Sequence, residues 1–234
     1  MKLAGWQKTT LIDYPGKVAA TIFVSGCNFR CPFCYSKELV LKEEIEKQPE
    51  ISERDFFNFL EERKRLLEAV VICGGEPTIH KDLPDFLKKI KKFGYLSKLD
   101  TNGSNPEMLK KIIEEDLLDY IAMDVKAPLL NEKYDKAAGL KVDLKKIKES
   151  VDLIKNSGVD YEFRITVVPG LQTKEDIIQI AKEIGKARRF FLQNFDSTKP
   201  LLDPSLQKIK PYSHEYLLEI REEILPFFEK VGIR

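Results

Sequence analysis

The sequence has few of the residues that usually build closed metal sites or disulfide frameworks. Its 234 residues include only four cysteines and two histidines. Three of the cysteines, Cys27, Cys31 and Cys34, lie within eight residues, and no fourth cysteine or histidine stands near them. We expect no disulfide framework, because four cysteines are few and the first residues do not resemble a secretory signal.

A structural zinc site is the simplest explanation for the three cysteines. Such sites usually take four ligands in tandem two-residue spacings. Here three residues separate Cys27 from Cys31, and the remaining candidates, Cys73, His80 and His214, have no ligand spacing. An iron-sulfur cluster held by only three thiolates instead leaves one iron open to a small molecule. The run indicates a reactive cluster and leaves zinc as the alternative.

The sequence also lacks a charge excess and a long apolar run. Lys and Arg number 39 against 38 Asp and Glu, so the formal net charge is +1 and no global field points to nucleic acid or a membrane. The apolar run at 18–24 is far too short to cross a bilayer, which predicts a soluble protein. An oxygen-labile cluster would place it in a reducing cytoplasm. With no linker or low-complexity segment visible, we expect a single domain over 1–234.

Apolar runs typical of strands alternate with amphipathic helical patterns. The predicted strands are 18–24, 69–73, 96–101, 120–126, 161–168 and 190–195. The predicted helices are 53–67 after the N-cap Ser52, then 83–93, 106–117, 144–156, 174–186 and 214–230. This alternation predicts an α/β fold, a partial (β/α)6 barrel of parallel strands with outer helices.

Glycine and polar residues stand where five of these strands end. After the cysteines that follow the first strand, the residues are Gly74, Gly75 and Glu76; Asp100, Thr101 and Asn102; Asp124 and Lys126; and, on the fifth strand, Arg164 ahead of Val168. Each has an ordinary explanation alone, as a turn, a helix cap or a salt bridge. Ligands gather at the carboxyl ends of parallel strands, so their joint occurrence predicts one binding mouth.

Two motifs carry a family resemblance. Cys27-x-x-x-Cys31-x-Phe33-Cys34 and Gly74-Gly75-Glu76-Pro77 resemble the signatures of the radical S-adenosylmethionine (SAM) superfamily. The later motifs, 100–103, Asp124-x-Lys126 and Arg164, further resemble the glycyl-radical-enzyme activases, including those of pyruvate formate-lyase and anaerobic ribonucleotide reductase. The opening, 8–16, is most similar to anaerobic ribonucleoside-triphosphate reductase activators.

The resemblance implies a role for each strand-end residue. Cys27, Cys31 and Cys34 would hold a [4Fe-4S] cluster whose open iron binds SAM. The backbone of Gly74 and Gly75 would approach the methionyl ammonium, and Glu76 would either organise the same corner by accepting hydrogen bonds or brace the loop. Lys126 and Arg164 would bind the SAM carboxylate. The adenine would lie near Phe33 and Val168. Asp100, Thr101 and Asp124 would form a monovalent-cation site, and Asn102 shares their motif. Tyr35 stands where pyruvate formate-lyase activase-like sequences commonly carry His, so the adenine-stacking partner is not assigned.

The implied activity is reductive cleavage of SAM to a 5'-deoxyadenosyl radical that removes a hydrogen atom from a glycine of a partner enzyme. The resemblance also implies an electron donor of the flavodoxin or ferredoxin type, and no side chain is assigned as a general base. Segments 134–140 and 200–212 are candidate partner contacts. Two alternatives stay open: a radical SAM enzyme acting on a small molecule or nucleoside, and a non-enzymatic electron carrier with Cys73 as fourth ligand or a zinc-stabilised module.

Overall fold

The computed structural model describes residues 1–49 and 51–234. The chain divides into two compact units, each built from separate stretches. The first comprises Met1–Asn28, Ser36–Thr101 and Glu107–Ile121, and the second comprises Phe29–Tyr35, Asn102–Pro106 and Ala122–Arg234. The single domain expected over 1–234 stays a prediction.

The first unit is built on a sheet with one antiparallel edge. β1 (Leu3–Thr10) runs antiparallel to β2 (Ala19–Val24), while β2, β3 (Ala69–Gly74) and β4 (Leu96–Thr101) are parallel. β5 (Tyr120–Asp124) begins in this unit and ends in the second. The parallel strands are almost wholly buried, as expected when helices cover a parallel sheet.

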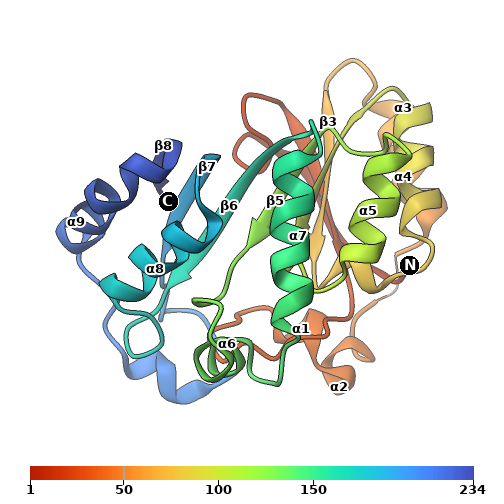
Figure 1. Ribbon diagram of the computed structural model, residues 1–234. Coiled ribbons are helices and arrows are strands. Elements are labelled where there is room, and N and C mark those ends of the chain that lie inside the picture. Colours follow the sequence, from red (N-terminus) through yellow and green to blue (C-terminus); the bar gives the residue numbers. More distant parts are fainter. Residues whose placement is uncertain (50) are drawn as a thin grey trace. The chain divides into compact units, whose positions relative to one another are not determined.

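Helices lie between the strands of the first unit along the chain. They are α1 (Lys37–Val40), α2 (Lys42–Ile45), α3 (Glu53–Glu62), α4 (Leu83–Lys92) and α5 (Pro106–Glu114) (Figure 1). The first residue of α5, Pro106, is the last residue of the stretch Asn102–Pro106, which belongs to the second unit. The Ser52 hydroxyl accepts the N–H of Asp55, which confirms the predicted N-cap. α3 ends at Glu62, five residues before the predicted end.

An aromatic cluster fills the core of the first unit. Phe56 is fully buried, and its ring centroid lies 6.0 Å from that of Trp6 and 5.9 Å from that of Phe86. Tyr14 packs against Tyr120 with 5.7 Å between ring centroids. These contacts make Trp6 and Tyr14 packing residues, because buried aromatic side chains contribute large apolar areas to a core.

The second unit repeats the pattern of strand and helix. Beside the end of β5 it contains the parallel strands β6 (Asp160–Val167), β7 (Ala187–Asn194) and β8 (Phe228–Ile233). Its helices are α6 (Asn131–Ala138), α7 (Leu144–Asn156), α8 (Lys174–Ile184) and α9 (His214–Ile224). α8 and α9 lie side by side, and α9 contacts β7 and β8 (Figure 1).

The predicted fold class, a partial α/β barrel with outer helices, is confirmed. Each strand of the eight-stranded sheet neighbours the next strand in the chain, and every described pair except β1 with β2 is parallel. All six predicted strands are present, and β1 and β8 are additional. Across residues 1–49 and 51–234, no helix combines the length and apolar character that a membrane span requires.

Two of the expectations are wrong. The helix predicted over 214–230 ends at Ile224, because Pro226 follows and has no N–H to continue the ladder, and residues 228–230 instead begin β8. The loop expected at 134–140 is helical as far as Ala138. Tyr134, Ala137 and Ala138 are fully buried there, so these three are not surface residues. Sequence signals missed α6 because its N-cap, Leu130, makes no side-chain cap bond.

Candidate functional site

The exits of β2 and β3 lie side by side in the first unit. The strands are parallel, and Val24 pairs with Gly74 at their carboxyl ends. Beyond them, the Gly75 N–H donates to the Val24 carbonyl at 2.8 Å, and the Glu76 N–H donates to the Gly26 carbonyl at 2.7 Å. The segment that leads into the first cysteine is thus held against the Gly-Gly-Glu turn.

This close approach accounts for both glycines. A Cβ atom added to Gly75 would lie 1.9 Å from the Gly26 carbonyl oxygen. One added to Gly74, whose φ is +114°, would lie 2.6 Å from the backbone N and O of Val24. Any side chain at either position would collide with backbone. The chain itself therefore requires the glycines, and their role toward SAM stays a prediction.

Glu76 braces the strand ends of the first unit. Its side chain is 1% exposed, and Oε1 accepts hydrogen bonds from the backbone N–H of Thr78, the Thr78 hydroxyl and the Thr101 hydroxyl, the last at 2.7 Å. Since Thr101 is the last residue of β4, this carboxylate ties the exit of β3 to the end of β4. Three donors on one oxygen stabilise the buried charge.

Asp100, also at the end of β4, has a cationic partner. It forms an ion pair with Lys98, which is 1% exposed although it is a lysine. The Lys98 ammonium also lies 5.8 Å from the centroid of the Tyr120 ring. A buried ion pair of this kind needs both members, because either charge alone would be left desolvated. The monovalent-cation site predicted from Asp100, Thr101 and Asp124 stays a prediction.

In the second unit, the loop with Cys31 and Cys34 is anchored at both ends. Its Arg30 N–H donates to the Ala138 carbonyl of α6 at 2.8 Å. The carbonyls of Pro32 and Cys34 accept the N–H groups of Asp203 and Leu202 at 2.9 Å and 2.8 Å, respectively. Further bonds inside the loop include the 3.0 Å turn from the Cys34 N–H to the Cys31 carbonyl. No local sequence pattern predicts these anchors, because they come from segments far away in the chain.

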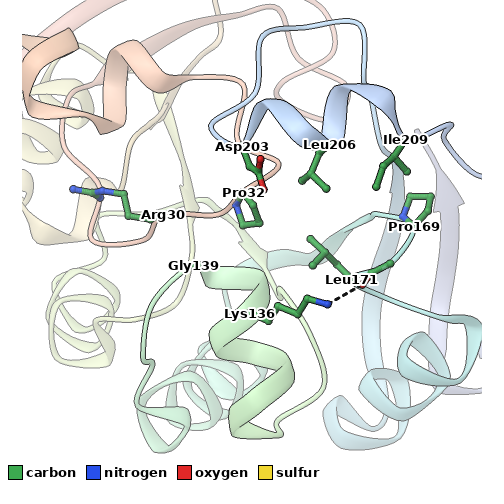
Figure 2. Close-up of a pocket in the computed structure, with 10 residues that line it drawn as sticks. Arg30, Pro32, Lys136, Gly139, Pro169, Leu171, Asp203, Leu206 and Ile209 are labelled. Carbon is green, nitrogen blue, oxygen red and sulfur yellow. Dashed lines mark hydrogen bonds between the residues drawn. The ribbon is translucent and has the colours of Figure 1, made fainter.

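A cavity of about 360 Å³ lies beside this loop within the second unit (Figure 2). Its lining residues are Arg30, Pro32, Lys136, Gly139, Pro169, Gly170, Leu171, Asp203, Leu206 and Ile209. The Lys136 ammonium donates a hydrogen bond of 3.2 Å to the carbonyl of Gly170, and Figure 2 marks this bond with the dashed line that starts at Lys136. Part of the 200–212 segment therefore supports the cysteine loop and opens onto the cavity, and its role in partner contact stays a prediction.

Three charged residues form a largely buried cluster in the second unit: Asp124 at the end of β5, Lys126 just beyond it, and Arg164 within β6. Arg164 Nε lies 2.8 Å from Asp124 Oδ1, and Lys126 Nζ lies 3.5 Å from Asp124 Oδ2. Burial alone would raise the pKa of Asp124, but the charges of Arg164 and Lys126 outweigh it and lower the pKa to about 2. Burial would lower the pKa of Lys126, and the Asp124 carboxylate raises it instead.

Lys126 connects this cluster with the cysteine loop. Its ammonium lies 6.0 Å from the centroid of the Phe33 ring, and Phe33 is 8% exposed. Burial raises the pKa of Cys31 to about 11, with the Lys126 charge opposing the shift. Cys31 is therefore a thiol in the metal-free protein, and metal binding at this sulfur would release a proton.

Gln172 is a positioning residue that the sequence analysis missed. It is fully buried, its Oε1 accepts the Val168 N–H at 2.9 Å, and its Nε2 donates to the Lys126 carbonyl at 2.7 Å. The side chain thus links the exits of β5 and β6, where Lys126 and Val168 were predicted to contact SAM. An isolated glutamine in a loop carries no motif from which this role could be read.

The Asp124 cluster predicts a loss of stability in acid. The pKa of this carboxyl is lower in the folded protein than its ordinary 3.8, so ionised Asp124 stabilises the fold above that pH. This contribution, roughly 2 kcal/mol, disappears as the pH falls from about 4 to about 2. Asp124→Asn should lower the free energy of unfolding at neutral pH and flatten this part of the profile.

Guanidinium chloride unfolding of metal-free protein at about pH 7, 4 and 2 measures the effect. Asp152→Asn, at an exposed position of α7 in the same unit, is the matched control and should follow the wild type. An Asp124→Asn profile that is parallel to the wild-type profile would contradict the assignment.

The predicted site residues are distributed over both units. Cys27, Gly74, Gly75, Glu76, Asp100 and Thr101 belong to the first, and Cys31, Phe33, Cys34, Asn102, Asp124, Lys126, Arg164 and Val168 to the second. Among residues 1–49 and 51–234, no group of three or more His, Cys, Asp or Glu side chains is placed to hold a metal ion. The three-cysteine ligand set stays a prediction.

The parallel strands define an α/β protein, and the cysteine run after β2 and the Gly-Gly-Glu turn after β3 are its candidate cofactor-binding segments. The family model of the radical SAM superfamily matches residues 21–184. The chain therefore belongs to the radical SAM superfamily, whose members use a [4Fe-4S] cluster and SAM.

Two relatives cover different shares of their own lengths. "Putative glycyl-radical enzyme activating enzyme MJ1227" of Methanocaldococcus jannaschii is 32% identical, over 99% of this chain and 95% of that protein. "Probable GTP 3',8-cyclase" of Thermococcus kodakarensis is 29% identical, over 75% of this chain and 57% of that protein.

A solved structure supports the fold. The SAM-bound crystal structure of Streptococcus suis SuiB is 18% identical and has a TM-score of 0.68. The match covers 90% of this chain and 48% of the SuiB chain, so this chain spans about half the length of SuiB. At this identity the similarity shows the fold alone.

Proposed function

We propose that this radical SAM enzyme generates a glycyl radical on a partner enzyme such as anaerobic ribonucleotide reductase. The observation that carries the proposal is the end-to-end match with the M. jannaschii protein, which covers 99% of this chain and 95% of that protein. The cyclase relative instead extends far beyond the matched part. A nucleotide substrate is the second candidate, because that relative is nearly as similar within the matched part.

The donor chemistry of the chain fits the cofactors of the superfamily. Cys27, Cys31 and Cys34 form no disulfide, and their thiolates would hold three of the four irons. The bound cluster and SAM would supply one electron and the 5'-deoxyadenosyl radical. The protein has to bind SAM, orient it and exclude water, so the proposal assigns no proton-transferring side chain.

Lys126 and Arg164 are the proposed contacts for the SAM carboxylate. Both are largely buried with Asp124, and Arg164 Nη1 also lies 3.9 Å from Oε1 of the buried Glu162, which pairs with Arg234. These three cations and two anions have a net positive charge, which the SAM carboxylate would balance, and Arg can bind a carboxylate through two parallel hydrogen bonds. We propose that Phe33 and Val168 line the adenine. The Phe33 ring lies beside the Lys126 ammonium, and the Val168 N–H donates a hydrogen bond to Gln172.

Anaerobic reconstitution with a glycyl-radical partner tests the function. Wild-type protein, iron, sulfide, a reductant and SAM should yield 5'-deoxyadenosine, and a glycyl radical should appear on the partner by electron paramagnetic resonance. A partner with alanine in place of the target glycine is the control and should give no signal. Formation of 5'-deoxyadenosine without a glycyl radical on any encoded partner would contradict activation, and consumption of GTP would favour the second candidate.

A further inference from the structure

Lys98 is a buried lysine in the first unit, and its ionic partner stands on the same strand. Its ammonium pairs with the Asp100 carboxylate. Successive side chains of a strand point to opposite faces, so Lys98 and Asp100, two residues apart in β4, lie on one face. Lysine is almost never fully buried unless it is paired. The end of β4 therefore carries its own counter-ion for Asp100.

The surroundings of Lys98 favour this position of the ammonium. Its nitrogen lies 5.8 Å from the centroid of the buried Tyr120 ring, and an aromatic ring attracts a cation. Moving the ammonium away from Asp100 would leave both charges desolvated. A further cation at the Asp100 carboxylate would have to displace the ammonium or lie next to it, and the second arrangement places like charges side by side.

The hydroxyl of Thr101 does not share the face of Asp100. As the next residue of β4, Thr101 points its side chain to the opposite face of the strand. There the hydroxyl donates to Glu76 Oε1 at 2.7 Å. The neighbouring side chains that the activase resemblance assigns to one monovalent cation thus point away from each other in the first unit.

The third predicted ligand, Asp124 of the second unit, also has cationic partners within the chain. Arg164 Nε lies 2.8 Å from Oδ1, and Lys126 Nζ lies 3.5 Å from Oδ2. Each of the two predicted carboxylate ligands is therefore paired with cationic side chains of its own unit. Oxygen ligands suit a hard cation, but this donor set does not fit an additional one, because its negative charges are already balanced.

We propose that the Lys98 ammonium supplies the positive charge that the activase resemblance assigns to a monovalent cation, so that SAM binding and cleavage need neither Na⁺ nor K⁺. The proposal rests on the SAM site proposed above and is independent of the radical acceptor. An ammonium carries the same single charge as these ions, and the fold holds it in place, so it need not be captured from solution. Lys98 is in this sense a positioning residue, which fixes Asp100 at the end of β4.

A salt exchange at constant ionic strength tests the proposal on the wild type. The reconstituted protein should bind SAM with the same Kd, and form 5'-deoxyadenosine at the same rate, in potassium chloride, sodium chloride and choline chloride. Choline is the reference because its quaternary ammonium is bulky and donates no N–H hydrogen bond. Weaker binding or slower cleavage in choline chloride, restored by Na⁺ or K⁺, would overturn the proposal.

Lys98→Met removes the ammonium and leaves Asp100 without this counter-ion. Its affinity for SAM should be lower than that of the wild type in choline chloride, and Na⁺ or K⁺ should restore part of it. Lys91→Met is the matched control: Lys91 pairs with Asp119 at 3.0 Å, and Asp119 accepts the Ser97 N–H near the beginning of β4. This variant should respond to the three salts as the wild type does.

The melting temperature of the metal-free protein gives a readout that needs no cofactor. Lys98→Met should melt below the wild type, by less in potassium chloride than in choline chloride. Adding Asp100→Asn to Lys98→Met should raise the melting temperature and remove this salt effect, because both charges are then absent. The same deficit of Lys98→Met in both salts would overturn the proposal. A wild type that forms no 5'-deoxyadenosine in any salt would instead contradict the proposed function, and the melting temperatures would still decide the role of Lys98.

Discussion

Replacing Cys31 by alanine is expected to reduce the formation of 5'-deoxyadenosine to background. With only two thiolates left in the run, the cluster would lose one of its three proposed protein ligands, and cluster-dependent cleavage of SAM should stop. Cys27→Ala and Cys34→Ala should have the same effect. Cys73→Ala should retain cleavage, because Cys73 lies within β3, outside the three-cysteine run, and is proposed to be a small packing residue.

Iron and sulfide contents of the four variants, measured after anaerobic reconstitution, separate loss of the cluster from loss of the fold. Circular dichroism should show the same metal-free fold for Cys31→Ala and Cys73→Ala. If Cys73→Ala also lost iron and activity, Cys73 would be a fourth ligand and the electron-carrier alternative would gain support. Stoichiometric zinc in purified wild type without iron would favour the zinc-stabilised module.

The sequence was most informative where structure follows from local chemistry. The strand at 96–101 and the helix at 144–156 have the predicted limits, because a turn or a capping residue marks each boundary. The rule that parallel strands present their carboxyl ends together predicts that Glu76, Thr101 and Asp124, with Arg164 on the fifth predicted strand, gather at one edge of the sheet. In each unit the structure brings two of these residues into contact, Glu76 with Thr101 and Asp124 with Arg164.

Other features depend on contacts that no local pattern records. α6 lacks a capping side chain, and its helical state follows from burial of Tyr134 and from its contact with Arg30. β8 was hidden because the segment around Pro226 continues a helical apolar pattern, and pairing with β7 decides its conformation. Gln172 acts through hydrogen bonds to residues that only folding brings near, so no local sequence pattern predicts its role.

Alanine at Gly75 is expected to destabilise the first unit strongly. The added Cβ would stand 1.9 Å from the Gly26 carbonyl oxygen, a contact that only backbone movement can relieve. That movement would break the 2.7 Å hydrogen bond from the Glu76 N–H to the same carbonyl and displace the residue before Cys27. Overpacking typically costs about 1–3 kcal/mol, and a collision with backbone that cannot easily move belongs at the upper end of that range. We therefore expect a large fall in the free energy of unfolding and a loss of bound iron.

Gly5→Ala is the matched control, because no atom lies within 4 Å of a Cβ atom added at that position of the same unit. Its free energy of unfolding, measured by denaturant titration with circular dichroism, should be equal to or slightly above that of the wild type. The same comparison separates two reasons for the glycine at position 75. A Gly75→Ala protein that folds and binds iron like the wild type, but has lost affinity for SAM, would show that the glycine serves the ligand. A protein that is destabilised before any ligand is added would show that the chain's own packing requires it, because the two strand exits then leave no room for a side chain.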